Sequence, residues 1–262
     1  MYWQKQNINQ PLFPDLFWDQ PISQIGANNF CLIGGSSTDF KQISLAYNLL
    51  QQKKYHQLYV ILPNSLRKIF QEQQSNLIFA PSNQSGAFNL ETFSLVEDLS
   101  LDSDILSMIG GFTTNSETII LIEKIINNIN KIKVISHDAI IDTFQPNQTI
   151  AIVQFKNLQK LLKNFRYHQA VTSNIELTKM IQIINDFCQQ FKLALITEFN
   201  QNLIAFYDNK VSLMEAKNNI ENWETNLNIL SSYYLANNYN KIFESITCAI
   251  YDFINFGAAR RT

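Results

Sequence analysis

Glycine is scarce in this chain, and most of the glycines follow apolar segments. Only seven occur in 262 residues, and four of them form two pairs, Gly34-Gly35 and Gly110-Gly111. The first pair lies in FCLIGGSSTD at 30–39 and the second in DILSMIGGFTTN at 104–115. Glycine accepts positive φ and lets another backbone approach closely. The two pairs therefore predict two sharp turns, each leading from a buried strand into a helix.

Apolar runs alternate with amphipathic stretches along the chain. A fully apolar run such as LYVIL at 58–62 is typical of a strand inside a parallel sheet. Because such runs are separated by segments with helical spacing, we expect right-handed βαβ units and a mainly parallel sheet. Residues 202–207 and 211–214, joined by Asp208-Asn209-Lys210, predict a late antiparallel hairpin on one edge. The other predicted strands are 30–33, 58–62, 77–80, 105–109, 133–136, 149–155 and 193–197.

The helix starts are predicted from capping signals. Ser37, Thr38 or Asp39 would cap a helix over 40–50. Capping-box spacing at Thr114 and Glu117, and again at Ser173 and Glu176, predicts two further helix starts. The last two helices are expected over 223–237 and 240–255.

The chain divides into an arm and one domain. Residues 1–22 are rich in aromatic side chains, and Pro11, Pro14 and Pro21 prevent a long helix there. Two interpretations of this arm stay open: it packs on its own domain, or it forms a subunit interface in a homo-oligomer. No linker or change of composition interrupts 23–262, so a single α/β domain is predicted there.

Composition excludes several classes of function. The net charge is −2 and no basic stripe exists, which argues against nucleic-acid binding. The three cysteines are far apart in apolar runs, as expected of buried, reduced thiols in a cytoplasmic protein. No signal peptide and no apolar run of about 18 residues is present, so a membrane span is not expected. No His, Cys or carboxylate spacing indicates a metal site.

Candidate site residues gather at the predicted carboxyl ends of strands, where open α/β sheets bind ligands. Amides of the two glycine turns can hold an anion, and the side chains of Ser36, Ser37, Thr113 and Asn115 could add hydrogen bonds. The alternative is that the glycines only make tight turns. His137-Asp138 is the most suggestive acid/base pair, although adjacent strand residues point to opposite faces. Neither the P-loop pattern nor the three-glycine dinucleotide pattern occurs.

The order of the motifs resembles that of the ADP/ATP-dependent NAD(P)H-hydrate dehydratase family of the ribokinase-like superfamily. Gly34-Gly35-Ser36 is similar to that family's VIGGS turn, and LYVILPNSL at 58–66 to its strand-Pro-x-Ser-Leu segment. ILSMIGGFTTNSET at 105–118 resembles its strand-GPGLG-x-x-ET segment, and VISHDAI at 134–140 its VLDADAL. The resemblance extends from residue 23 to the last helix. It implies a ribokinase-like three-layer α/β fold with a mainly parallel central sheet flanked by helices.

Departures from the family fall on its chemical positions. The family's His-Pro-Gly-Glu loop is matched by residues 154–157, QFKN, and its Val-Leu-Lys-Gly by 195–198, LITE. Its phosphate-binding and catalytic Gly-Thr/Ser-Gly-Asp loop is matched by 225–228, TNLN. Asn228 therefore stands at the catalytic Asp position, and an amide cannot act as a general base.

The glycine turns and the resemblance together predict a set of site residues. The predicted substrate-binding residues are Gly34, Gly35, Ser36, Gly110, Gly111, Thr113 and Asn115, and the predicted catalytic positions are Asp138 and the inactive Asn228. Three hypotheses follow. The preferred one is a pseudoenzyme that binds a ligand or a protein partner. The second is an active dehydratase or small-molecule kinase with a rearranged site, which would use ADP or ATP and NAD(P)H hydrate. The third is a structural subunit of a homo-oligomer.

Overall fold

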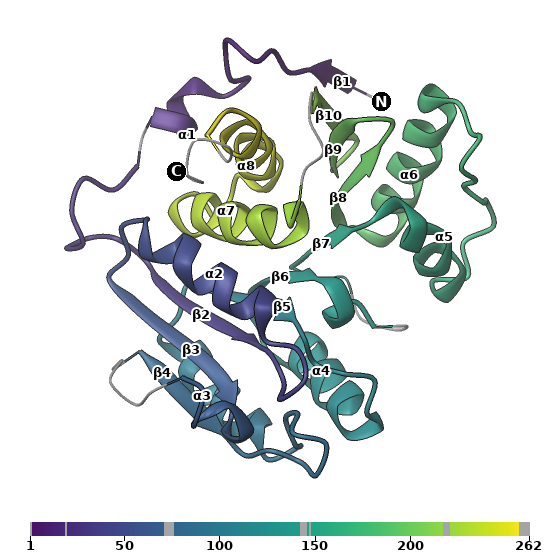
Figure 1. Cartoon of the computed structure of the whole chain (residues 1–262). Coiled ribbons are helices and arrows are strands. Elements are labelled where there is room, and N and C mark those ends of the chain that lie inside the picture. Colours follow the sequence, from purple (N-terminus) through teal and green to yellow (C-terminus); the bar gives the residue numbers. More distant parts are fainter. Residues whose placement is uncertain are drawn as a thin grey trace. The chain divides into compact units, whose positions relative to one another are not determined.

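The computed structural model describes residues 2–18, 20–70, 76–141, 146, 148–216 and 221–256. The chain forms two compact units (Figure 1). We call Pro21–Gln145 the continuous unit, and Met1–Gln20 together with Pro146–Thr262 the composite unit. The predicted single domain over 23–262 stays a prediction.

The continuous unit contains five parallel strands in the order β6-β5-β2-β3-β4 (Figure 1). Every residue of β5, and all of β2 after its first residue, is buried, as the apolar runs predicted. Helix α2 packs on β2 and β5, and α3 packs against α4. The bounds are β2 (Asn29–Gly34), α2 (Lys41–Gln51), β3 (Gln57–Pro63), η1 (Asn64–Leu66), β4 (Leu77–Ala80), α3 (Thr92–Leu101), β5 (Ile105–Gly110), α4 (Ser116–Asn128), β6 (Ile132–Ser136) and η2 (His137–Ala139).

The composite unit contains five strands in the order β7-β8-β9-β10-β1. Strands β7 and β8 are parallel, whereas β9 is antiparallel to both of its neighbours, β8 and β10. Helices α7 and α8 pack together, and α8 also contacts β9 and β10. The bounds are β1 (Tyr2–Lys5), α1 (Pro14–Trp18), β7 (Thr149–Val153), α5 (Phe155–Asn164), α6 (Leu177–Phe191), β8 (Ala194–Phe199), β9 (Asn202–Tyr207), β10 (Lys210–Glu215), α7 (Trp223–Asn237) and α8 (Ile242–Phe256).

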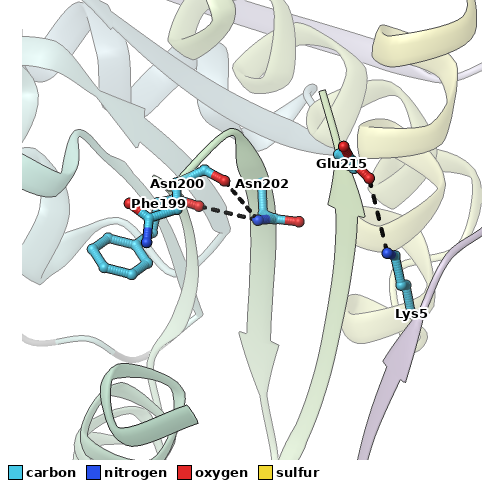
Figure 2. Close-up of polar contacts among 5 residues, drawn as sticks. All are labelled: Lys5, Phe199, Asn200, Asn202 and Glu215. Carbon is cyan, nitrogen blue, oxygen red and sulfur yellow. Dashed lines mark hydrogen bonds and ion pairs between the residues drawn. The ribbon is translucent and has the colours of Figure 1, made fainter. Parts of the chain in front are cut away.

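The predicted hairpin is present, but it is not the edge of its sheet. Strand β1 pairs in parallel with β10 and forms the edge of the sheet, although no strand was predicted in the arm. Lys5 and Glu215 form an ion pair of 3.9 Å between these two strands (Figure 2). At the same end of the sheet, Asn202 is the first residue of β9 and the register partner of Glu215. Its side chain donates to the carbonyl of Asn200 at 2.8 Å and supports the turn from β8 (Figure 2).

All three predicted helix caps are wrong, beginning with α2, whose N-cap is Phe40 and not Ser37, Thr38 or Asp39. Helix α4 is capped by Asn115, whose side chain accepts from the Glu117 amide at 2.9 Å, and not by Thr114. The Glu117 carboxylate instead accepts a hydrogen bond from the amide of Leu90, which lies 27 residues away in the sequence. At α6 the N-cap is Glu176, with no side-chain cap bond among the described residues, so Ser173 does not form the expected capping box.

The N-terminal arm packs on its own chain. Gln6 is 3% exposed, and its side chain donates to the Thr247 carbonyl of α8 at 3.2 Å and accepts from the Leu12 amide at 3.2 Å. The ring of Phe17 meets the rings of Tyr234 and Tyr251, with centroids 6.3 and 5.0 Å away. These contacts make the arm part of the core of the composite unit. Its role in an oligomer stays a prediction.

Among the described residues, no helix is long and apolar enough to cross a bilayer.

We predict that Phe17→Ala destabilises the composite unit and that the neighbouring Trp18→Ala does not. Phe17 is 6% exposed, whereas Trp18 is 73% exposed. Removing a buried aromatic ring lowers the free energy of unfolding by about 3–5 kcal/mol, and removing an exposed one by less than about 1 kcal/mol. Urea unfolding followed by tryptophan fluorescence measures both, because all three tryptophans of the chain belong to this unit. Equal losses in the two variants would contradict the packing of the arm.

Candidate functional site

The two Gly-Gly turns lie against each other at the carboxyl ends of β2 and β5. The Gly35 amide donates to the Gly110 carbonyl at 2.8 Å. A Cβ on Gly34 would lie 2.7 Å from the Gly110 carbonyl oxygen, and a Cβ on Gly111 would lie 2.5 Å from the Asp39 carbonyl oxygen. Real Cβ atoms do not approach so closely, so the glycines are needed for one turn to pack on the other.

Ser36 holds the first turn closed. It is fully buried, and its hydroxyl accepts from the Asp39 amide at 3.2 Å. Its own amide donates to the Asp39 carbonyl at 2.8 Å. Asp39 does not cap α2, whose N-cap is Phe40. The hydroxyl of Ser36 therefore serves the turn itself.

Asp138 binds the backbone of the second turn. Its Oδ1 accepts from the Gly111 amide at 2.8 Å, and its Oδ2 accepts from the amides of Phe112 and Thr113 at 2.9 and 3.2 Å. Asp138 is solvent-exposed as a residue, while its carboxylate lies against these amides. Burial raises the pKa of the carboxyl, and the three backbone hydrogen bonds oppose that change.

His137 packs beside Gly110 with an imidazole that stays neutral at pH 7. Burial lowers its pKa to about 4, and the charge of Asp39 opposes the shift. A Cβ on Gly110 would lie 2.7 Å from the His137 Cβ. His137 has a left-handed φ of 56°, which turns the chain sharply after β6. His137 and Asp138 thus both contact the second glycine turn, although they are adjacent in sequence.

Thr113 and Asn115 have different roles. The Asn115 side chain is used to cap α4. Thr113 has a φ of 70°, an uncommon value for a β-branched residue. Its buried Oγ1 has no hydrogen-bond partner within the part of the chain that the structure describes. Of the two predicted side-chain donors, Thr113 is therefore the one whose hydroxyl is not used to hold the loop.

A third turn, at 81–89, belongs to the same cluster and was not among the predicted site residues. The Gly86 carbonyl accepts from the Ser37 amide at 3.0 Å and from the Ser65 hydroxyl at 2.6 Å. The ring of Phe88 packs on that of Phe112, with centroids 5.9 Å apart. The sequence signal was Gly86 itself, one of seven glycines, in the polar segment SNQSG that follows a predicted strand.

In the composite unit, residues 225–228 are helical. They lie in the first two turns of α7, and the Asn226 amide donates to the Asn222 carbonyl at 3.1 Å. Asn228 is fully buried, and its carbonyl accepts from the Ser232 hydroxyl at 2.8 Å. Glu224, in the first turn of α7, is 4% exposed, and its carboxylate accepts a hydrogen bond from Gln154. The segment that resembles the family's phosphate loop is thus the start of a helix with a buried carboxylate.

Within the described ranges, no group of three or more His, Cys, Asp or Glu side chains is arranged to hold a metal ion.

This chain is similar to known proteins in its structure, and not at the level of sequence families. No protein-family model and no curated protein matches the sequence. A ribokinase-like superfamily protein from Enterococcus faecalis matches with a TM-score of 0.72 and 11% identity, over 99% of this chain and 88% of that one. A hypothetical protein from Streptococcus mutans gives 0.73 and 12%, over 98% and 91%. The ADP/ATP-dependent NAD(P)H-hydrate dehydratase from Bacillus subtilis gives 0.70 and 10%, over 97% and 90%. The ribokinase-like α/β fold that the sequence resemblance implied is confirmed.

We predict that Gly111→Ala is much more damaging than Gly26→Ala. Both glycines have positive φ, 79° and 92°, so alanine is strained by about 1–2 kcal/mol at either site. Only Gly111 is also crowded, while a Cβ at Gly26 would meet nothing within 4 Å. The crowding adds about 1–3 kcal/mol of lost stability. Thermal unfolding followed by circular dichroism compares the two, and similar midpoints would show that the turns do not need to pack closely.

We also predict that His137 makes stability fall in acid. Because the folded protein disfavours the imidazolium, the unfolded chain takes up this proton first as the pH drops below 6.5. The free energy of unfolding should therefore decrease by up to about 3 kcal/mol between about pH 6.5 and about pH 4. This contribution should be absent in His137→Asn and retained in His168→Asn, whose imidazole is exposed. Parallel pH profiles for wild type and His137→Asn, measured by urea unfolding, would contradict the assignment.

Proposed function

We propose that this chain is a ribokinase-like protein that does not catalyse nucleotide-dependent dehydration and that acts as a binding module. The proposal depends chiefly on Glu224, whose buried carboxylate lies in the first turn of α7.

A carboxylate at this position replaces an incoming phosphate. The N-terminus of a helix carries a partial positive charge and exposed amides, which attract anions. The Glu224 carboxylate already lies in this turn and accepts a hydrogen bond from Gln154. A phosphate approaching the same helix end would meet electron-rich carboxylate oxygens at short range. This argues against ADP or ATP binding at the segment that resembles the family's phosphate loop.

The position that corresponds to the catalytic Asp of the similar family also lacks a base. Asn228 carries an amide, which cannot accept a proton from a substrate at neutral pH. It lies fully buried in the second turn of a regular helix, where the Asn226 amide is already bonded. Both features support the loss of catalysis, since neither the proton acceptor nor a free phosphate-binding loop is present in 225–228.

The continuous unit supports a binding function. Asp138 accepts three hydrogen bonds from the backbone of the second glycine turn, so both of its carboxylate oxygens are engaged in holding that turn. The buried Thr113 hydroxyl has no hydrogen-bond partner among the described residues, so it is not used to hold this turn. We therefore propose that the Gly-Gly turns shape a ligand-binding surface in which chemistry does not take place.

One observation favours the alternative of an enzyme with a rearranged site. The imidazole of His137 is neutral at pH 7, because burial lowers its pKa to about 4. A neutral imidazole at a strand end is a possible proton acceptor. Turnover of NAD(P)H hydrate by the purified chain, abolished in His137→Asn, would establish this alternative.

We predict that ADP and ATP do not stabilise the wild-type chain. A nucleotide at about 100 times its dissociation constant would add about 2.7 kcal/mol to the free energy of unfolding. Thermal shift with millimolar ADP or ATP, with and without Mg²⁺, measures this, and the Bacillus subtilis dehydratase serves as the positive control. A clear rise in the wild-type midpoint would contradict the proposal.

The charge of Glu224 is tested with a matched pair of variants. Glu224→Gln removes the charge at the start of α7 and keeps the shape, whereas Glu221→Gln removes an exposed charge three residues earlier. If the carboxylate is what excludes phosphate, only Glu224→Gln should gain a response to ATP. A gain in both variants would indicate a general effect of charge.

A further inference from the structure

Three consecutive backbone amides converge on one carboxylate in the continuous unit. Those of Gly111, Phe112 and Thr113 donate to Asp138 at 2.8, 2.9 and 3.2 Å. Successive amides that point to one side of a turn form an anion-binding concavity. This concavity is occupied by a side chain of the same protein.

The turn that presents these amides is strained at Thr113. Gly110 and Gly111 have φ values of 110° and 79°, which glycine adopts without strain, but the β-branched Thr113 has a φ of 70°. Such a conformation at Thr113 persists only when its surroundings hold it in place. Hydrogen bonds from amides to an ionised carboxylate are stronger than neutral ones. Asp138 therefore supplies the interaction that holds the turn in this shape.

The neighbouring residues leave room for this carboxylate. A Cβ on Gly110 would lie 2.9 Å from Asp138 Oδ1 and 2.7 Å from the His137 Cβ. Glycine at position 110 thus gives space to Asp138 as well as allowing the turn. Because Asp138 is solvent-exposed as a residue, the amides would become accessible to small solutes if its side chain were removed.

We propose that Asp138 is a built-in anion, which fills a carboxylate-binding site formed by the amides of 111–113. It is a positioning residue for the second glycine turn and not a general base. The site itself has the chemistry to bind a small free carboxylate such as formate or acetate in place of the side chain.

Chemical rescue tests the proposal. Asp138→Ala should unfold at a temperature lower than that of the wild type by about 5 °C or more. Sodium formate should then raise its midpoint with saturation, whereas sodium chloride at the same ionic strength should not. Wild-type protein and Asp104→Ala are the controls, since the Asp104 carboxylate accepts from the single amide of Asn29 at 2.8 Å. A formate response no larger than that of the controls would overturn the proposal.

A second variant keeps the test valid if Asp138→Ala does not fold. Asp138→Asn retains the shape of the side chain but places an amide NH₂ where one carboxylate oxygen accepts. Hydrogen exchange at the amides of 111–113 should become faster by about tenfold or more, because the loop then opens more readily. No response to formate is expected, since the side chain still fills the site. Unchanged exchange at these three amides would overturn the proposal.

Discussion

The contact between the two glycine turns is the constraint on which the continuous unit depends. Gly35 donates to the Gly110 carbonyl, and Gly111 lies so close to Asp39 that no side chain fits between them. Because this approach joins backbone to backbone, the ends of β2 and β5 are held at a separation that only glycine permits. The loops that carry Ser36, Thr113 and Asp138 take their positions from this contact.

Both units place a carboxylate of their own where backbone amides would attract an anion. Asp138 lies among three amides of the second glycine turn, and Glu224 lies in the first turn of α7. Helix ends and turns of this kind bind phosphate or carboxylate groups in many proteins. Asp138 satisfies its three amides with a side chain of the protein itself, whereas the Glu224 carboxylate is held by Gln154. In both places a carboxylate of the chain lies where a bound anion would otherwise be expected.

The aromatic arm illustrates how a segment without clear periodicity can still be structural. Gln6 reaches the Thr247 carbonyl, and Phe17 packs on Tyr234 and Tyr251, more than 200 residues away in sequence. A single buried Gln with both ends hydrogen-bonded is stable in a core, whereas an unpaired one would be costly. The arm closes the composite unit by joining β10 and α8.

Sequence periodicity determined the local elements, since helical and strand spacing depend only on neighbouring residues. It placed β4, β9 and α7 at their observed bounds, and the glycine pairs marked the two turns that meet at the site. The tertiary structure alone decided which groups satisfy which amides. The Asn115 side chain caps α4, the Glu117 carboxylate accepts from the distant Leu90 amide, and β1 pairs with β10. Asp138 likewise resembles a catalytic acid in sequence, and only the folding of 111–113 around it reveals three bonds to the backbone. Hydrogen-bond partners distant in the chain are set by the fold, which no local pattern encodes.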